Sequence, residues 1–204
     1  GSTMHTQTAS TQATRSASAP AMGPLQISEI ILHTRHFDIM QSWYSRLFEG
    51  LKPAVESEPQ RGLKSAPEVT RLCFFRIHFQ YPFTQVLGLF EVPEISSGNP
   101  RAPGLNHMQF REASLENLFQ RYEMLKSEGV LPFKCYNHGP GSSFYYRDPD
   151  GNEVELSATN FANQEDYLAF MRSEAFRSNV EGHAVDAQRY IAEVRAALGM
   201  SNGE

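Results

Sequence analysis

The sequence predicts an α+β fold built from two consecutive β-α-β-β-β modules with helices after them. Three observations predict this fold. A strand, a helix and further strands begin near residue 27, and the same pattern begins again near residue 105. The turn Asp148–Asn152 joins two β-rich runs into a hairpin, since Pro fixes φ and Gly accepts a positive φ. After Asn160 the apolar residues recur at helical spacing rather than at every second position.

The composition is that of an ordinary globular protein. Hydrophobic residues make up 40% of the 204 residues and charged residues 20%, enough for one good-sized domain or two small ones. The net charge of −5 and the lack of a Lys/Arg-rich block argue against nucleic acid or an anionic membrane surface as a partner. No apolar run approaches the ~18 residues of a membrane span. Cys73 and Cys135 fit neither a disulfide framework nor zinc spacing, so we expect a reducing, cytoplasmic environment.

The chain is expected to divide into a tail, a folded domain and an extension. Residues 1–24 are rich in Ser, Thr, Ala and Gln without a period, which predicts a disordered tail, and its first three residues resemble a cloning remnant. The two modules, 25–95 and 104–160, are expected to form one domain, 25–160. A helical extension, 161–204, completes the chain.

The first module is expected to begin with a strand at 27–34. A helix follows, because apolar side chains recur at helical spacing from Phe37 to Phe48, and Gly50 ends the pattern. Three strands then complete the module, at 52–58, 70–79 and 83–92, before a linker at 93–103. The aromatic residues expected in its core are Trp43, Tyr44, Phe74, Phe75 and Phe79.

The second module repeats this order. A strand at 105–111 leads to a helix that Ser114 caps and Gly129 ends. A shift of 78 positions places Tyr44 on Tyr122, and a shift of 79 places Gly50 on Gly129. Two amphipathic helices share some apolar positions by coincidence, but the matched Tyr and Gly favour an internal repeat.

The last predicted strand, 153–157, carries the first candidate for chemistry. With a period of two, Glu153, Glu155 and Ser157 share one face of the strand, and Val154 and Leu156 share the other. A carboxylate beside buried apolar neighbours costs free energy unless it is paired or bound to a metal, which makes Glu155 a candidate ligand. The alternative is that all three polar side chains face solvent.

The repeat adds two more candidates. The 78-residue shift places Glu29 on His107, each near the start of the first strand of its module. If the modules pair about a pseudo-twofold axis, these side chains and Glu155 converge, and one imidazole with two carboxylates makes a candidate metal site. Alternatively, His107 is a core histidine and Glu29 a charge at a strand edge. His33 shares a face with Glu29, but four strand residues separate the two by ~13 Å.

Two segments, 104–110 and 137–156, resemble the vicinal oxygen chelate superfamily, which includes glyoxalases, bleomycin-resistance proteins and type I extradiol dioxygenases. The resemblance spans about 27–176 and rests on His-Gly-Pro followed by Ser-Phe-Tyr-Tyr-Arg-Asp-Pro-Asp-Gly-Asn-x-Val-Glu-Leu. Within the superfamily it points to the one-domain relatives of biphenyl-2,3-diol 1,2-dioxygenases. It implies paired modules whose strands curl into a cup around one divalent metal, which is Fe(II) in the dioxygenase branch, with Mn(II) or Zn(II) as alternatives.

The same resemblance implies roles for individual residues. His107 matches the second metal-binding His, Glu155 the metal-binding Glu, and Tyr145 an active-site tyrosine, while His138 lies where the branch has a polar catalytic or substrate-binding group. Glu29 stands where the first metal-binding His would be, which makes the site one charge less positive and harder ions more competitive. The implied reaction is the ring opening of a metal-bound catecholate by O2.

We therefore expect an extradiol-dioxygenase-like enzyme that acts on a small aromatic diol. One alternative is a glyoxalase-like isomerase or lyase, for which Glu91 is the nearest candidate for a fourth carboxylate from the first module. A metal-free ligand-binding protein is the other. A homodimer is left open, because the C-terminal helices, about 163–176 and 186–198, could cover a sheet edge, a dimer seam or the cup itself. The residues expected to face inward from these helices are Leu168, Met171, Phe176, Ile191, Val194 and Leu198.

Overall fold

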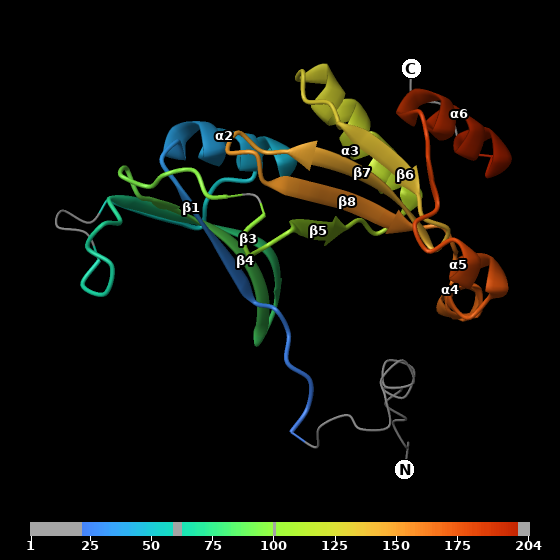
Figure 1. Cartoon of the computed structure of the whole chain (residues 1–204), viewed down its shortest axis with the longest axis horizontal. Helices are drawn as coiled ribbons and strands as arrows, with labels where there is room; N and C mark the ends of the chain where they lie inside the picture. The colour runs from blue at the N-terminus through green and yellow to red at the C-terminus, as the bar shows by residue number, and fades with distance from the viewer. Residues whose placement is uncertain (1–21, 59–62, 100, 200–204) are drawn as a thin grey trace, which may run out of the picture.

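The structure of the chain, a computed structural model, describes residues 22–58, 63–99 and 101–199 (Figure 1). The predicted tail lies outside the described residues except for its last three positions. No helix in the described ranges is both long enough and apolar enough to cross a membrane.

The first module forms a four-stranded sheet with one helix. Its elements are β1 (Glu29–Thr34), α2 (Phe37–Leu47), β2 (Val55–Ser57), β3 (Arg71–Gln80) and β4 (Phe83–Glu91). The strands lie in the order β1-β4-β3-β2, and β1 runs parallel to β4 while the other pairs are antiparallel.

The second module has the same topology. Its elements are β5 (His107–Arg111), α3 (Leu115–Ser127), β6 (Lys134–Asn137), β7 (Gly141–Arg147) and β8 (Glu153–Thr159). The strands lie in the order β5-β8-β7-β6, and β5 runs parallel to β8 just as β1 runs parallel to β4. The predicted α+β fold of two repeated modules is confirmed.

Helix α3 begins, and both helices end, for the predicted local reasons. Ser114 accepts a hydrogen bond from the backbone N–H of Asn117, which caps α3. Gly50 and Gly129 follow α2 and α3 with φ of 81°, in the left-handed region that glycine adopts without strain. Both helices lie on the same side of the sheets (Figure 1), and their buried faces belong to one hydrophobic core.

A buried polar contact also links the two modules. The hydroxyl of Tyr44 on α2 donates to Asp148 Oδ2, at 2.7 Å, in the turn between β7 and β8. Asp148 additionally accepts from the backbone N–H groups of Asp150 and Asn152 and from the Asn152 side chain. Since Tyr44 and Asp148 are 0% and 4% exposed, this contact lies inside the shared core.

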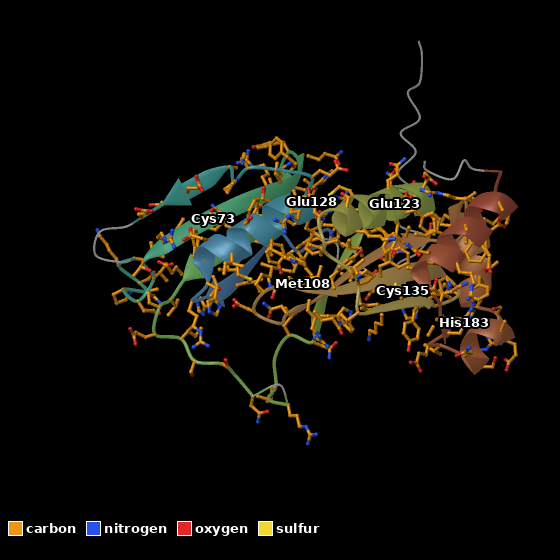
Figure 2. All side chains as sticks on the ribbon, turned by 90° about the horizontal axis from the view of Figure 1, so that it is seen from above. Cys73, Met108, Glu123, Glu128, Cys135 and His183 are labelled. Carbon is orange, nitrogen blue, oxygen red and sulfur yellow. The ribbon has the colours of Figure 1, made fainter. Side chains whose placement is uncertain are left out.

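The aromatic core is confirmed except at the end of β3. Trp43, Tyr44 and Phe75 are buried and Phe74 is half-buried, but Phe79 is 56% exposed. A register shift between Arg76 and His78 interrupts the alternation of faces along β3 just before Phe79. Figure 2 labels Cys73 and Cys135 in the first and second module, where both are buried free thiols.

The C-terminal extension contains α4 (Gln164–Met171), α5 (Glu174–Ser178), β9 (His183–Ala184) and α6 (Ala187–Ala197). The first predicted helix is thus divided in two, because Ser173 caps a new helix by accepting from the N–H of Phe176. Strand β9 pairs with the free edge of β6, which confirms that the extension covers a sheet edge. Helix α6 packs on α3 through Ile191 and Arg195, whereas Leu198 is 61% exposed and does not face inward as predicted.

Candidate metal and catalytic site

The parallel pairing of β5 with β8 brings His107 and Glu155 together. His107 lies opposite Glu153 in the register and Gln109 lies opposite Glu155. The Nε2 atom of His107 is 2.9 Å from Glu155 Oε1, and the other carboxylate oxygen accepts from the Ser143 hydroxyl at 2.7 Å. Glu155 is only 5% exposed, so the alternative in which it faces solvent is wrong.

The surroundings of His107 fit a cation between this imidazole and Glu155. Its Nδ1 atom is 2.6 Å from the side-chain oxygen of Asn106. A neutral imidazole carries one N–H, so a ring that donates from Nδ1 presents the lone pair of Nε2 to a carboxylate. A divalent ion relieves that repulsion, and metal-bound histidines usually donate their other N–H to an oxygen in this way. The pair therefore fits two ligands of one ion.

Glu29 is not brought to this pair. It lies exposed on β1 opposite Val86, which is the position in the first module that His107 occupies in the second. Within the described ranges, no three His, Cys, Asp or Glu side chains are grouped closely enough to hold an ion. His33 is also exposed and packs toward the ring of Phe90, 6.3 Å away. The three-ligand set with Glu29 stays a prediction.

A second reactive pair lies beside the first. The hydroxyl of Tyr145 lies 2.7 Å from His138 Nε2, and His138 Nδ1 is 2.5 Å from the backbone oxygen of Glu181. Because a carbonyl only accepts, Nδ1 carries the proton and Nε2 accepts from Tyr145. Burial raises the pKa of Tyr145 above its usual value, and the negative charge of Glu155 adds to the increase, so the phenol keeps its proton.

The two pairs are contiguous. Tyr145 on β7 lies directly opposite Glu155 on β8, and its ring centroid is 6.3 Å from that of His107. The structure thus brings together four of the five predicted site residues. Sequence reasoning missed Ser143, although the alternation along β7 places it on the same face as Tyr145.

A cavity of about 210 Å³ opens above this part of the sheet. Its floor is polar and is formed by side chains of β5, β7 and β8: Gln109, Arg111, Ser143, Glu155 and Ser157. His138 lies at one side. Its ceiling is mostly apolar and comes from the C-terminal extension: Tyr167, Met171, Phe176 and Val180. Helices α4 and α5 therefore cover the site, as one of the open alternatives predicted.

This geometry can be compared with known proteins. No protein-family model matches the chain. Biphenyl-2,3-diol 1,2-dioxygenase 2 of Rhodococcus globerulus is 29% identical over 79% of this chain and 77% of its own, and biphenyl-2,3-diol 1,2-dioxygenase 3 of the same organism is 28% identical over 77% and 75%. A glyoxylase/bleomycin resistance protein/dioxygenase domain from Frankia sp. EAN1pec has the same fold, with a TM-score of 0.54 at 20% identity over 68% of this chain and 100% of that one. These similarities support the resemblance to the vicinal oxygen chelate superfamily. The resemblance identified from the sequence is confirmed.

The two modules differ at the row of paired strand residues that contains Glu155. In the second module, Gln109 and Tyr145 flank Glu155 on the neighbouring strands. The corresponding row of the first module is Ile31, Gly88 and Phe74. A Cβ on Gly88 would lie 2.9 Å from the Phe74 ring and closer still to Ile31, so a larger residue there would require these two side chains to shift. The first module therefore offers an apolar row where the second offers hydrogen-bonding groups.

Glu91 is not free to serve as a fourth ligand. One of its oxygens accepts from Arg71 Nη2 at 2.7 Å, and the other from the Thr70 hydroxyl at 2.7 Å. The hydrogen bonds from Arg71 hold the pKa of Glu91 below its usual value. This carboxylate is therefore neutralised by Arg71 within its own module, three residues beyond Gly88 on β4.

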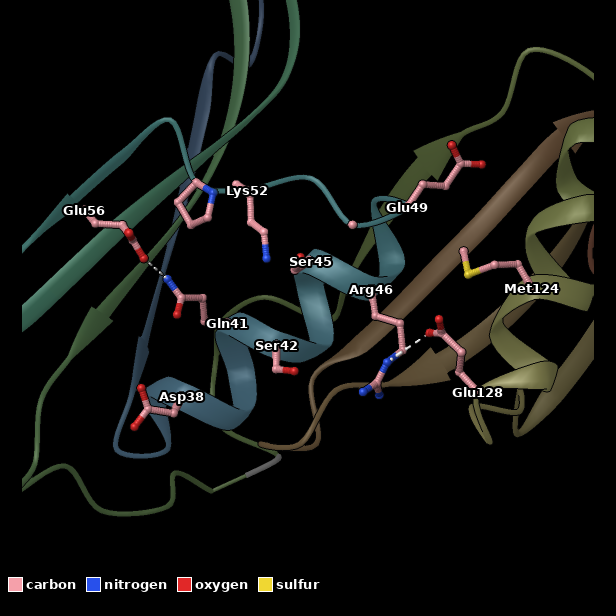
Figure 3. A pocket seen from close by; sticks show the side chains of 12 residues that line it. Asp38, Gln41, Ser42, Ser45, Arg46, Glu49, Lys52, Glu56, Met124 and Glu128 are labelled. Carbon is pink, nitrogen blue, oxygen red and sulfur yellow. Dashed lines mark hydrogen bonds and ion pairs between the residues drawn. The ribbon is translucent and has the colours of Figure 1, made fainter.

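A larger hollow of about 870 Å³ lies between α2, the loop after it and the end of α3 (Figure 3). Its lining side chains pair with one another, because Gln41 donates to Glu56 at 2.5 Å and Arg46 forms an ion pair with Glu128 at 3.0 Å. None of the five predicted site residues lines it. Two of them, His138 and Glu155, line the smaller cavity.

The extension also positions His138, and Gly182 makes this possible. Gly182 has a φ of 80°, and a Cβ there would lie 2.6 Å from the Cα of His138 and even nearer to the carbonyl of Asn137. Replacing Gly182 by Ala should push residues 181–184 off β6. We expect the free energy of unfolding to fall by about 1–3 kcal/mol more than for the matched control Gly199→Ala.

Gly199 is a suitable control because its φ of 68° imposes similar backbone strain, while nothing lies within 4 Å of a Cβ at that position. Denaturant unfolding measures the difference, and nitrogen NMR shifts of the His138 ring report whether Nδ1 keeps its proton. Equal losses in both variants, with an unchanged His138 ring, would show that the contact with residue 182 does not hold this loop.

Proposed function

We propose that the protein is a divalent-metal-dependent enzyme that opens the ring of a small catecholic aromatic next to one hydroxyl, with O2 as the co-substrate. The observation that carries the proposal is the adjacency of the His107–Glu155 pair and the His138–Tyr145 pair beside one covered cavity. The two relatives named biphenyl-2,3-diol 1,2-dioxygenases support this choice of reaction.

His107 and Glu155 would hold the ion, with Glu29 as the proposed third ligand. Fe(II) is the proposed metal, with Mn(II) or Zn(II) as alternatives. When bound, the ion supplies coordination positions for both oxygens of the diol and for O2. The Ser143 hydroxyl, which donates to the second oxygen of Glu155, orients that carboxylate toward His107.

The chain's own groups handle the proton. With Nδ1 protonated and held by the Glu181 carbonyl, Nε2 of His138 has the lone pair that accepts a proton from a substrate hydroxyl. Tyr145 donates to this lone pair in the structure, and rotation of its O–H frees Nε2 and turns the donor toward a developing oxygen anion. Helices α4 and α5 line one side of the cavity and would limit the access of water to it while this occurs.

The second candidate is a metal-free ligand-binding protein, which is favoured by the lack of any three-residue ligand group within the described ranges. A glyoxalase-like isomerase or lyase has less support. This function needs a further carboxylate ligand from the first module. There, the position that corresponds to Glu155 is Gly88, which lies opposite Ile31, and the carboxylate of Glu91 is bound by Arg71.

Metal stoichiometry under anaerobic conditions, followed by O2 uptake with 3-methylcatechol, tests the proposal. We expect about one Fe(II) per chain and O2 consumption matched to ring-opened product. His107→Ala and Glu155→Ala should abolish both, whereas Glu91→Gln should leave both unchanged. A protein that binds the catechol without any divalent ion, and consumes no O2, would favour the metal-free candidate instead.

The position of Glu29 gives a separate prediction. Glu29→His should raise the affinity for Fe(II) relative to Mn(II) and Zn(II), because imidazole is a softer ligand than carboxylate. Competitive metal titration of the variant measures this ratio. If the ratio does not change, residue 29 is not a ligand and the site depends on His107 and Glu155 alone.

A further inference from the structure

The cavity is lined by a positively charged side chain, Arg111, that has no part in the proposed chemistry. Arg111 is the last residue of β5 and lies opposite Ser157, two residues beyond the pair of Gln109 and Glu155. Two strand residues correspond to roughly 7 Å, and alternation places Arg111 on the same face as Gln109. A guanidinium therefore lies one step along the floor from the proposed metal position.

The guanidinium of Arg111 is positioned but not neutralised. Its Nη2 atom donates to Gln109 Oε1 at 3.1 Å, and the same oxygen accepts from the Ser157 hydroxyl at 2.7 Å. Among the described residues, no carboxylate lies within ion-pair distance of Arg111, and its Nε and Nη1 atoms have no hydrogen-bond acceptor. By contrast, Arg71, Arg121 and Arg195 are each bound by carboxylates.

The rest of the cavity suits a single aromatic ring. Its volume of about 210 Å³ is below the roughly 300–1,000 Å³ of typical ligand pockets. Tyr167, Met171 and Phe176 provide an apolar and aromatic ceiling for a ring. Gly141 packs closely beside Arg111, since a Cβ there would lie 2.7 Å from the backbone oxygen of Ala158 and 3.5 Å from Arg111 Nη1.

We propose that the substrate is a single-ring catechol whose side chain ends in a carboxylate, and that Arg111 binds this carboxylate. The inference rests on the proposed function, because the diol end is placed at His107 and Glu155. A planar guanidinium with free donors matches a carboxylate in two-point geometry, whereas an uncharged second ring would leave those donors unpaired.

The test uses two catechols that differ only at the end of the side chain. One is 3-(2,3-dihydroxyphenyl)propionate and the other is 3-propylcatechol, with 2,3-dihydroxybiphenyl as a larger probe. Anaerobic calorimetric titration of the metal-loaded full chain gives each dissociation constant. We expect the propionate to bind at least about tenfold more tightly than either uncharged catechol, and its affinity to fall as salt is raised.

The variant Arg111→Gln should weaken binding of the propionate about tenfold and leave 3-propylcatechol within twofold. Arg111→Lys keeps the positive charge but lacks the planar pair of N–H donors, so its affinity for the propionate should lie between those of the wild type and Arg111→Gln. Arg189→Gln is the matched control, because Arg189 is an exposed arginine on α6 away from the cavity lining. Circular dichroism of each variant confirms that it is folded.

The outcomes separate this inference from the proposed function. If both short catechols bind equally well to the wild type, the ring-cleavage proposal stands and the assignment of Arg111 is wrong. If Arg111→Gln weakens both catechols equally, Arg111 only supports the floor and does not select the substrate. If no catechol binds, both proposals are wrong.

Discussion

Replacing His138 by Gln should lower turnover on a catecholic substrate by about 10²–10⁴-fold while the metal content stays unchanged. Gln is close in size and retains a hydrogen-bonding group near the Tyr145 hydroxyl, but its amide accepts no proton at neutral pH. The loss should therefore fall on kcat rather than on KM. Steady-state O2 uptake together with metal analysis measures both quantities.

His183→Gln is the matched control for this prediction. His183 is exposed on β9, next to the segment that binds His138, and its side chain does not line the cavity. We expect its turnover to stay within about twofold of the wild type. Near-normal turnover of His138→Gln would return His138 to a surface loop with no catalytic part, and loss of metal would identify it as a ligand.

The variant Asp148→Ala should lower the free energy of unfolding by about 3–4 kcal/mol. The substitution removes the acceptor of the buried Tyr44 hydroxyl and of three donors in the β7–β8 turn. It therefore weakens a turn and the contact between the two modules together. Urea denaturation at neutral pH measures the change.

Asp38→Ala is a suitable comparison, since Asp38 pairs with Arg71 but its side chain is 77% exposed. Its loss should cost much less than the loss of Asp148, because solvent screens an exposed ion pair. Equal effects of the two substitutions would mean that the contact between Tyr44 and Asp148 does not stabilise the core.

The pH dependence of Asp148 has a definite sign. Burial raises the pKa of Asp148 above its usual value, although its hydrogen bonds oppose the increase. The proton-linked part of this group's contribution to stability is therefore complete below the unfolded-state pKa of about 3.9 and is lost as pH rises through the higher folded-state pKa. The hydrogen bonds that Asp148 accepts remain at neutral pH. In the Asp148→Ala variant, the decrease in the free energy of unfolding that this linkage causes as pH rises should be absent. Urea denaturation at several pH values measures it.

The sequence was sufficient for the fold because its signals are local. Gly50, Gly129 and Ser114 mark helix ends by their own backbone preferences, and the hairpin follows from the turn chemistry at Asp148–Asn152. The division between α4 and α5 escaped prediction, because a Ser in a run of helical spacing signals a cap only when its hydroxyl turns to the backbone.

The structure brings predicted site residues together where their own strands position them. Glu155 was identified by the alternation along β8, and His107 by the repeat. The contact of His138 with Glu181 could not be predicted, since a backbone carbonyl has no sequence signal and the two residues are 43 positions apart. Arg111 was missed for a related reason: its isolation from carboxylates is a property of the folded surface rather than of the pattern along β5.

The difference between the rows around Gly88 and Glu155 has a consequence for how a substrate enters. A duplicated module would, in its symmetric form, offer two equivalent ways to place a ligand across the axis between the copies. Here one copy has specialised in reactive groups and the other in an apolar wall, and the lack of space around Gly88 hinders a return to symmetry. Under the proposed function, the diol end would be directed to one copy only, and the divergence of the two halves would set the orientation in which the substrate binds.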